Sequence, residues 1–270
     1  MNKNISIKPF KNNVGAFIDL DLNAASKDQI NNIKNALDDY GVIFFRNQNL
    51  NSENYIKFAK HFGEFADYPM LKGLDNYPKI TVVEKKPDEK IMFGEGWHTD
   101  STYTTHPPKY TMLYSIKTPA KGKGNTRFAS QYLSYKNLNK NIKNKIKNLK
   151  AIFSADGPIS KTRDNRTAEK GTGVDPGSLF AEHEIVRVNN QNNKKSLYLS
   201  PGHVTGIVGL KKEESKKLLS YLFEHQIKPE FIYNFEWESN CIAIWNNHAV
   251  LHNPTNDFNE HRVMHRITIK

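Results

Sequence analysis

The sequence predicts a mainly β protein with helices packed around a β-rich core. Short apolar runs rich in β-branched and aromatic residues recur along the chain, which is typical of buried strands. Fewer segments carry their apolar residues at helical spacing. The chain has 270 residues, enough for one sizeable core, and neither a repeat nor a shift in composition marks a boundary. We therefore expect a single domain over residues 1–270.

The first third of the chain is expected to hold two helices set among strands. Ser26 and Gln29 fit a capping box at the start of the first helix, and Gly41 ends it. The apolar run VIFF at 42–45 predicts a buried strand. Apolar residues on one face predict a second helix over 51–62, which stops at the glycine that follows.

The remainder of the chain alternates strands and turns and holds two further helices. Apolar residues on one side of each segment predict helices over 134–149 and 212–225. Between them, residues 157–178 are polar and rich in glycine, and so long a loop in a compact domain usually has a function. We expect this stretch to form a lid over an active site. Further strands are expected over residues 79–83, 112–114, 231–237, 241–245 and 263–269.

The composition favours a cytoplasmic protein that binds neither nucleic acid nor membrane. Lysine and arginine number 39 against 28 acidic residues, a net charge of +11, but no arginine-rich arm or zinc-finger spacing accompanies them. No run approaches the ~20 apolar residues of a membrane span, and the N-terminus lacks the apolar core of a signal peptide. The single cysteine, Cys241, forms no internal disulfide. Homo-oligomerisation stays open.

A short histidine and aspartate pattern is the strongest chemical signal in the sequence. In the extended segment WHTD, the side chains of His98 and Asp100 point to the same face and can bind one ion. Two histidines and one carboxylate form the facial triad of non-haem Fe(II) oxygenases, which leaves positions open for a co-substrate and O₂. Candidates for the second histidine lie in the C-terminal strand region: His248, His252 and His265.

Three motifs in sequence order carry a family resemblance. They are GEGWHTDSTYTTHPP, GNTRFAS at 124–130 and IWNNHAVLHNPTNDFNEHRVMHRITI at 244–269, preceded by DYGVIFFRNQNL and FAKHFGEF. Together they resemble the taurine dioxygenase / 2,4-dichlorophenoxyacetate dioxygenase (TauD/TfdA) family of Fe(II)- and 2-oxoglutarate-dependent oxygenases. The resemblance covers nearly the whole chain, and it implies a double-stranded β-helix, or jelly roll, with helices outside.

The resemblance also implies roles for individual residues. It makes His98, Asp100 and His252 the iron ligands. Thr126, in GNTRFAS, matches the position that binds a carboxylate of 2-oxoglutarate. Arg262 follows His252 by ten residues and matches the arginine that holds the distal carboxylate of 2-oxoglutarate. A guanidinium group suits that role because it grips a carboxylate with two parallel hydrogen bonds and stays charged.

For the substrate, the resemblance implies an anionic group near Arg266. This residue matches the arginine that faces the substrate's sulfonate in the taurine enzyme. Tyr68 and Gly94 stand near the positions of a histidine and an asparagine that hold taurine there, so taurine itself is put in doubt. Tyr68 and His203 are further candidates for the substrate pocket.

The other histidines are expected to have structural roles. The spacing to Arg262 favours His252 over His248 as the ligand, which leaves His248 a supporting role. We expect His265 to be packed or hydrogen-bonded. Helix-end or surface positions are expected for His61, His183 and His225.

The resemblance therefore implies an enzyme that uses Fe(II), 2-oxoglutarate and O₂ to hydroxylate a small, anionic organic substrate, releasing succinate and CO₂. Asp100 favours hydroxylation because related halogenases lack this carboxylate. Three alternatives are left open: the same chemistry on a non-anionic small molecule, the same chemistry on a macromolecule, and a non-catalytic jelly-roll binding protein.

Overall fold

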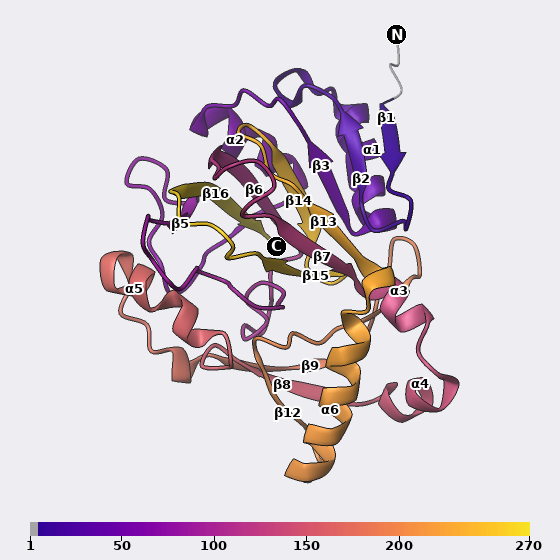
Figure 1. Ribbon diagram of the computed structural model, residues 1–270. Helices are drawn as coiled ribbons and strands as arrows, with labels where there is room; N and C mark the ends of the chain where they lie inside the picture. Colours follow the sequence, from indigo (N-terminus) through magenta and orange to yellow (C-terminus); the bar gives the residue numbers. More distant parts are fainter. Residues whose placement is uncertain (1–4) are drawn as a thin grey trace.

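The computed structural model describes residues 5–270 and places a mainly β core between two sets of helices (Figure 1). Its largest sheet has the strand order β1-β2-β3-β14-β6-β16-β4, with β5 paired to the other part of β16. The strands of this sheet are β1 (Ser6–Pro9), β2 (Ala16–Asp19), β3 (Val42–Phe45), β4 (Phe65–Ala66), β5 (Thr81–Lys85), β6 (Tyr110–Lys117), β14 (Ile242–Asn246) and β16 (Arg262–Ile269).

A three-stranded sheet packs against one face of the large sheet and completes the jelly roll. In this sheet β7 (Thr126–Ser130) lies between β13 (Ile232–Phe235) and β15 (Val250–Pro254). Phe44 of β3 stacks on Phe235 of β13, with ring centroids 4.1 Å apart, and meets Phe128 of β7 edge to face at 5.4 Å. The jelly-roll fold that the sequence predicts is therefore confirmed, and its inner layer is aromatic.

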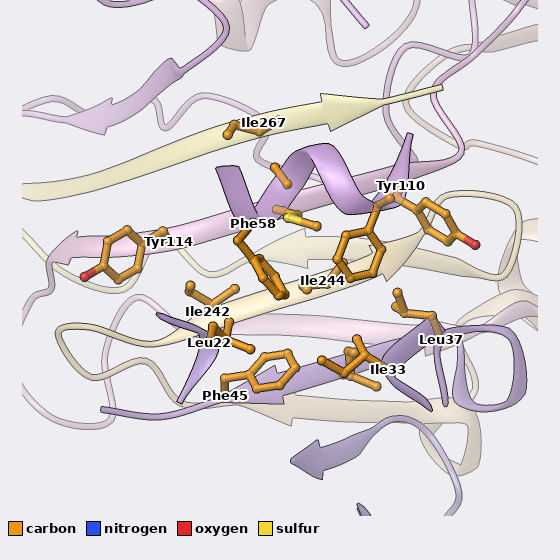
Figure 2. Close-up of a cluster of buried hydrophobic side chains, with 14 of the residues drawn as sticks. Leu22, Ile33, Leu37, Phe45, Phe58, Tyr110, Tyr114, Ile242, Ile244 and Ile267 are labelled. Atoms are coloured by element: carbon orange, nitrogen blue, oxygen red, sulfur yellow. The ribbon is translucent and has the colours of Figure 1, made fainter. Parts of the chain in front are cut away.

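The opposite face of the large sheet is covered by two helices, α1 (Lys27–Tyr40) and α2 (Ser52–Ala59). Figure 2 shows Ile33 and Leu37 of α1 and Phe58 of α2 packed over Phe45 and the neighbouring strands. All four residues of β3 are buried because successive side chains of a strand point to opposite faces, and here both faces are covered. This double coverage explains the unbroken apolar run in the sequence.

The helix starts and stops follow the predicted caps. The Ser26 hydroxyl accepts a hydrogen bond from the Gln29 amide at 3.3 Å, and the Gln29 side chain accepts one from the Ser26 amide at 2.9 Å. Gly41 ends α1 with φ = 77°, a conformation that favours glycine because it has no Cβ. The carboxamide of Asn51 caps α2 in the same way, by accepting from the Asn54 amide.

A second, smaller layer lies at one end of the jelly roll. Its sheet has the order β12-β8-β9, and the helix α6 (Lys212–Gln226) packs its leucines against it (Figure 1). The helix matches the predicted span 212–225. The three strands of this sheet are β8 (Lys150–Ser154), β9 (Phe180–Glu184) and β12 (Val204–Ile207). The layer also contains a hairpin of β10 (Val186–Val188) and β11 (Lys195–Leu197).

Two sequence predictions need correction. The single helix expected over 134–149 is two short helices, α3 (Gln131–Lys136) and α4 (Lys140–Ile146). The break falls at the asparagines: Asn137 ends α3, and the Asn139 side chain caps the next helix by accepting from the Asn141 amide. An asparagine side chain competes with the backbone for hydrogen bonds. The helix over 134–149 is predicted from the spacing of apolar residues, which does not include this effect.

The stretch 157–178 is not a plain loop. It contains a 3₁₀ turn, η3 (Ser160–Arg163), then the helix α5 (Asp164–Lys170), and a second 3₁₀ turn, η4 (Pro176–Ser178). Two of its arginines, Arg163 and Arg166, are buried, which the polar sequence of this stretch does not indicate. Among the described residues, 5–270, no helix has the length and apolar character needed to cross a membrane.

Candidate active site

His98 and His252 are brought together by a short antiparallel backbone pairing. The His98 amide donates to the His252 carbonyl at 3.0 Å, and the His252 amide donates back at 2.8 Å. Directly opposed residues of an antiparallel pair project their side chains to the same side. The two imidazole rings consequently lie with their centroids 4.1 Å apart.

The Asp100 carboxylate lies close to the rings of His98 and His252. Its Oδ2 accepts a hydrogen bond from the Thr111 hydroxyl at 2.7 Å, and its Oδ1 lies 3.5 Å from Nη1 of Arg266. Burial by itself raises the pKa of this carboxyl group. Interactions with His252 and with the Arg266 guanidinium, together with the hydrogen bond from Thr111, outweigh that effect and hold the pKa at about 2. Asp100 is therefore a carboxylate at any working pH.

The three side chains form a donor set that fits a divalent metal ion. One atom from each of His98, Asp100 and His252 lies within 4.8 Å of the others, and all three residues are buried. Nδ1 of His98 lies 2.9 Å from the Gly96 carbonyl, which leaves its Nε2 for an ion. Burial lowers the pKa of both histidines, that of His252 to about 3, so the rings are neutral as metal binding requires.

A buried, unsatisfied guanidinium lies beside this donor set. Arg262 of β16 is 3% exposed, and its Nε and Nη2 have no hydrogen-bond partner within residues 5–270. Burial lowers its pKa to about 10, so the group is still a cation at neutral pH. It lines one cavity together with His98, Asp100 and His252. A buried cation without a counter-charge is costly, and a carboxylate ligand would satisfy it with two hydrogen bonds.

Thr126 lines the same cavity from the start of β7. Its hydroxyl oxygen accepts a hydrogen bond from Nε1 of Trp237 at 2.9 Å. Because the indole N–H can only donate, the hydroxyl proton of Thr126 is free for a ligand in the cavity. Thr126 and Arg262 are thus two donors that one carboxylate ligand can meet.

The candidate substrate residues Arg266 and Tyr68 also meet. The guanidinium carbon of Arg266 lies 4.4 Å from the centroid of the Tyr68 ring and 5.5 Å from that of Phe93. Arg266 is buried, and its Nε and Nη2 have no partner within the described part of the chain. The aromatic rings hold the guanidinium plane in place and leave its edge for an anion.

His203 lies in the second cavity next to the donor set, together with Tyr68 and Arg266. Its Nδ1 lies 2.9 Å from the Thr102 hydroxyl and 3.1 Å from that of Ser200. Burial lowers the pKa of His203 well below its usual range, so the ring is neutral. The structure therefore places all eight sequence-predicted site residues around two adjoining cavities.

The other histidines lie away from the donor set. Nε2 of His248 lies 2.8 Å from Nη1 of Arg187, so His248 supports that arginine. His183 is buried in β9, contrary to the helix-end or surface position expected for it, and its Nε2 lies 2.9 Å from the carbonyl of Thr102. The expectations hold for the remaining three: His61 is exposed, His225 lies near the end of α6, and His265 is half-buried in β16.

Three residues outside the sequence-predicted set also shape the site: Thr111, Asn247 and Arg163. Asn247 accepts from Nε1 of Trp245 at 2.9 Å and donates to the Thr111 hydroxyl, also at 2.9 Å, which fixes the group that holds Asp100. Arg163 of η3 lines the second cavity. No spacing in the sequence marks Thr111 or Asn247, and the only signal for Arg163 was its place in the predicted lid.

Comparison with known proteins matches the chain to one protein family. The family described as "Taurine catabolism dioxygenase TauD, TfdA family" matches residues 6–268. The alpha-ketoglutarate-dependent sulfonate dioxygenase of Saccharomyces cerevisiae is 29% identical over 262 residues, which cover 92% of this chain and 61% of that protein. This chain thus spans less than two thirds of the yeast protein.

Two further proteins are similar to this chain over most of its length. The (S)-phenoxypropionate/alpha-ketoglutarate-dioxygenase of Sphingobium herbicidovorans is 29% identical over 235 residues, covering 84% of this chain and 80% of that protein. The crystal structure of AAD-2 in complex with Mn(II) and N-oxalylglycine superposes with a TM-score of 0.83 at 25% identity. That superposition covers 99% of this chain and 97% of AAD-2.

Proposed function

The chain belongs to the TauD/TfdA family of 2-oxoglutarate-dependent dioxygenases, and on that premise we propose that it hydroxylates a small organic anion with Fe(II) and O₂. Succinate and CO₂ are the other products. The observation that carries the proposal is Arg266, a buried guanidinium that lies 3.5 Å from the carboxylate of Asp100 and leaves two nitrogens unsatisfied. Such a group beside a metal site calls for an anionic substrate.

We propose that His98, Asp100 and His252 hold the iron. Two neutral imidazoles and one carboxylate would hold the ion through three ligands, a donor set that leaves positions for a co-substrate. When bound, iron supplies the O₂ chemistry that couples oxidation of the substrate to decarboxylation of 2-oxoglutarate. Thr111 keeps Asp100 ionised and oriented by donating to Oδ2. A carboxylate at this position favours hydroxylation.

Arg262 and Thr126 are proposed to bind 2-oxoglutarate. The free edge of the Arg262 guanidinium suits the distal carboxylate, and the free hydroxyl proton of Thr126 adds a third donor. Both side chains line the cavity that the three iron ligands also line. The chain thus orients the co-substrate from β7 and β16, two strands that belong to different sheets of the sandwich.

The proposed substrate carries a sulfonate or a carboxylate group. A sulfonate is named for the yeast relative and a phenoxy acid for the Sphingobium relative, and both are organic anions. Arg266 is proposed to bind the anionic group, with Tyr68 and His203 along the wall of the same cavity. Taurine is not the favoured sulfonate, because Tyr68 and Gly94 stand where a histidine and an asparagine would hold it.

A small molecule is proposed in preference to a macromolecule because of where the positive charge lies. Lysines are densest over residues 136–150 and 211–217, on and around α4 and the start of α6. Neither stretch contributes a residue to the two cavities. The arginines at the cavities are buried, whereas nucleic-acid binding needs a basic groove that is open to solvent.

We further propose that residues 157–178 act as a lid. Ile159, Thr162 and Arg163 of this stretch line the second cavity, so its movement would open or close the route to the substrate site. Arg166 pins the same stretch to the body of the protein through Glu84 and Glu89.

Anaerobic addition of Fe(II) and 2-oxoglutarate tests the site. The protein should develop the weak visible charge-transfer band of a chelated co-substrate, and His252→Ala should abolish it. His248→Gln is the matched control and should keep the band, because His248 contacts Arg187 and not the donor set. Absence of the band from the unmodified protein, or its persistence in His252→Ala, contradicts the assignment.

Release of succinate tests the substrate class. Sulfonates, aryloxyalkanoates and short carboxylates should stimulate release of succinate in air, and Arg266→Gln should raise KM for the anion that works best. Stimulation only by uncharged compounds contradicts the role of Arg266.

A further inference from the structure

Arg163 is a second buried arginine in the substrate cavity. It ends the 3₁₀ turn η3, is 4% exposed, and lines the cavity with Arg266, Tyr68 and His203. Among the described residues its guanidinium makes one hydrogen bond, from Nη2 to the carbonyl of Ala155, and no ion pair. Most of its five N–H donors are therefore left for something that enters the cavity.

Arg166, three residues further along the same stretch, shows what a structural arginine looks like here. It is equally buried, and Glu84, Glu89 and Glu169 surround its guanidinium. A buried cation is stable in that form because carboxylates supply both counter-charge and hydrogen bonds. Arg163 has no such partner within residues 5–270. Its burial next to Arg266 thus lacks a structural explanation and matches that of a ligand-binding group.

The charges that line the two cavities do not balance. Three arginines, Arg163, Arg262 and Arg266, face one carboxylate, Asp100, and the histidines are neutral. The charge of a divalent metal ion and the charge of dianionic 2-oxoglutarate cancel each other. Two positive charges of the chain are then left for the substrate to meet, and in a buried site uncompensated charge is costly.

We propose that Arg163 is a substrate-binding residue and that the substrate is a small dianion, with one acidic group on Arg266 and a second on Arg163. The inference rests on the proposed dioxygenase function and narrows its substrate class. A short sulfocarboxylate has the required charge. A substrate with an ammonium group fits poorly, because Asp100 is the only carboxylate among the lining residues and it is already a metal-ligand candidate.

The location of Arg163 would let the protein select a dianionic substrate over a monoanionic one. It lies on the proposed lid, whereas Arg266 lies on β16 of the main sheet. A dianion would join the two through its own charges and hold the stretch 157–178 closed. A monoanion bound at Arg266 leaves Arg163 buried and unpaired, so the protein discriminates against it.

A matched ligand series tests the proposal. Sulfoacetate, 3-sulfopropanoate and 4-sulfobutanoate are each compared with the alkanesulfonate and the aminoalkanesulfonate of the same chain length. Dissociation constants come from the change that each compound causes in the anaerobic Fe(II)–2-oxoglutarate band, so no turnover is needed. At least one dianion should bind tenfold or more tightly than its two matched compounds.

Three variants separate substrate binding from a structural role. Arg163→Gln should weaken binding of the preferred dianion at least tenfold and change binding of the monosulfonate less than twofold. Arg163→Lys should restore part of the loss, since it keeps the charge. Lys161→Gln, an exposed neighbour on the same turn, should behave as the unmodified protein.

The possible failures are distinct. If no dianion is preferred, or if Arg163→Gln and Arg163→Lys weaken all ligands alike, the inference is overturned while the dioxygenase assignment stands. If the unmodified protein shows no charge-transfer band before any substrate is added, the proposed function itself fails.

Discussion

The peptide groups of His98 and His252 exchange two hydrogen bonds, although the residues are more than 150 positions apart. The two proposed metal ligands therefore join a loop of the first half of the chain to β15 near its end. A metal ion at this junction binds the folded chain only, because unfolding separates the ligands.

Metal binding should accordingly raise the thermal stability. At a free Mn(II) concentration 100 times its Kd, the native state gains about 2.7 kcal/mol, a rise in Tm of several degrees. EDTA should reverse the rise, and calorimetry or near-ultraviolet circular dichroism measures it. His252→Ala should show no rise, whereas His248→Gln should show the full effect. An equal rise in both variants places the metal elsewhere.

Replacing Arg262 by lysine should weaken binding of 2-oxoglutarate while the metal still binds. Lysine keeps a charge but cannot make two parallel hydrogen bonds to a carboxylate, a loss of about 1.5–3 kcal/mol. The Kd for 2-oxoglutarate, titrated through the anaerobic band, should rise roughly tenfold to a hundredfold by that difference. Arg46→Lys, at a half-exposed ion pair with Glu238, is the control and should leave the Kd unchanged. An unchanged Kd in Arg262→Lys removes Arg262 from the co-substrate site.

The protein should lose stability as the pH falls below about 6.5, in part through His248. Burial, with Arg187 next to it, lowers the pKa of His248 to about 3, against about 6.5 in the unfolded chain. Between these values the unfolded chain binds a proton that the native state refuses, so the free energy of unfolding decreases with falling pH. At pH 4.5 the loss from this residue is about 2–3 kcal/mol relative to neutral pH.

Urea unfolding at pH 7.5 and 4.5 measures this effect. His248→Gln keeps an acceptor for Arg187 and removes the titrating ring, so its stability should vary less with pH than that of the unmodified protein. If the free energy of unfolding falls by the same amount between pH 7.5 and 4.5 in both proteins, His248 does not contribute to the pH dependence.

Phe45→Ala should destabilise the protein by about 3–5 kcal/mol. Phe45 of β3 is fully buried, and Figure 2 shows it packed in the cluster formed with α1 and α2. Removing its ring leaves a cavity that the helices cannot fill. The denaturation midpoint measures the loss. Ile116→Ala, at a site that is 41% exposed on β6, should stay within about 0.5 kcal/mol. A small effect at Phe45 would mean that this face of the sheet is loosely packed.

Arg166→Gln should loosen the proposed lid. The change leaves Glu84, Glu89 and Glu169 without their common partner. Since Glu169 is 41% exposed and water screens it, the expected cost is about 1–3 kcal/mol, less than for a fully buried pair. Amide hydrogen exchange over 157–178 should quicken at least fivefold, with β14 unchanged. Lys170→Gln on the same helix is the control, and equal exchange in both variants contradicts the pinning role.

Local signals in the sequence were sufficient for the elements whose structure depends on neighbouring residues. The capping box at Ser26 and the stop at Gly41 concern backbone groups within one helix turn, and the structure has both. The break between α3 and α4 was missed because the side chain of Asn139 competes for the backbone there, an effect that apolar spacing does not record.

The sequence by itself determined the mainly β fold and the family, and it supplied the proposed metal-ligand residues, since these follow from residue types in a fixed order. Only the tertiary structure decided which distant groups meet. His252 pairs with His98 while His248 turns to Arg187, and Thr111 reaches Asp100. Arg163 and Arg166 look alike in the sequence, yet one is surrounded by carboxylates and the other faces the cavity. The physical reason is that the cost of a buried charge depends on what surrounds it, and chain folding sets those surroundings.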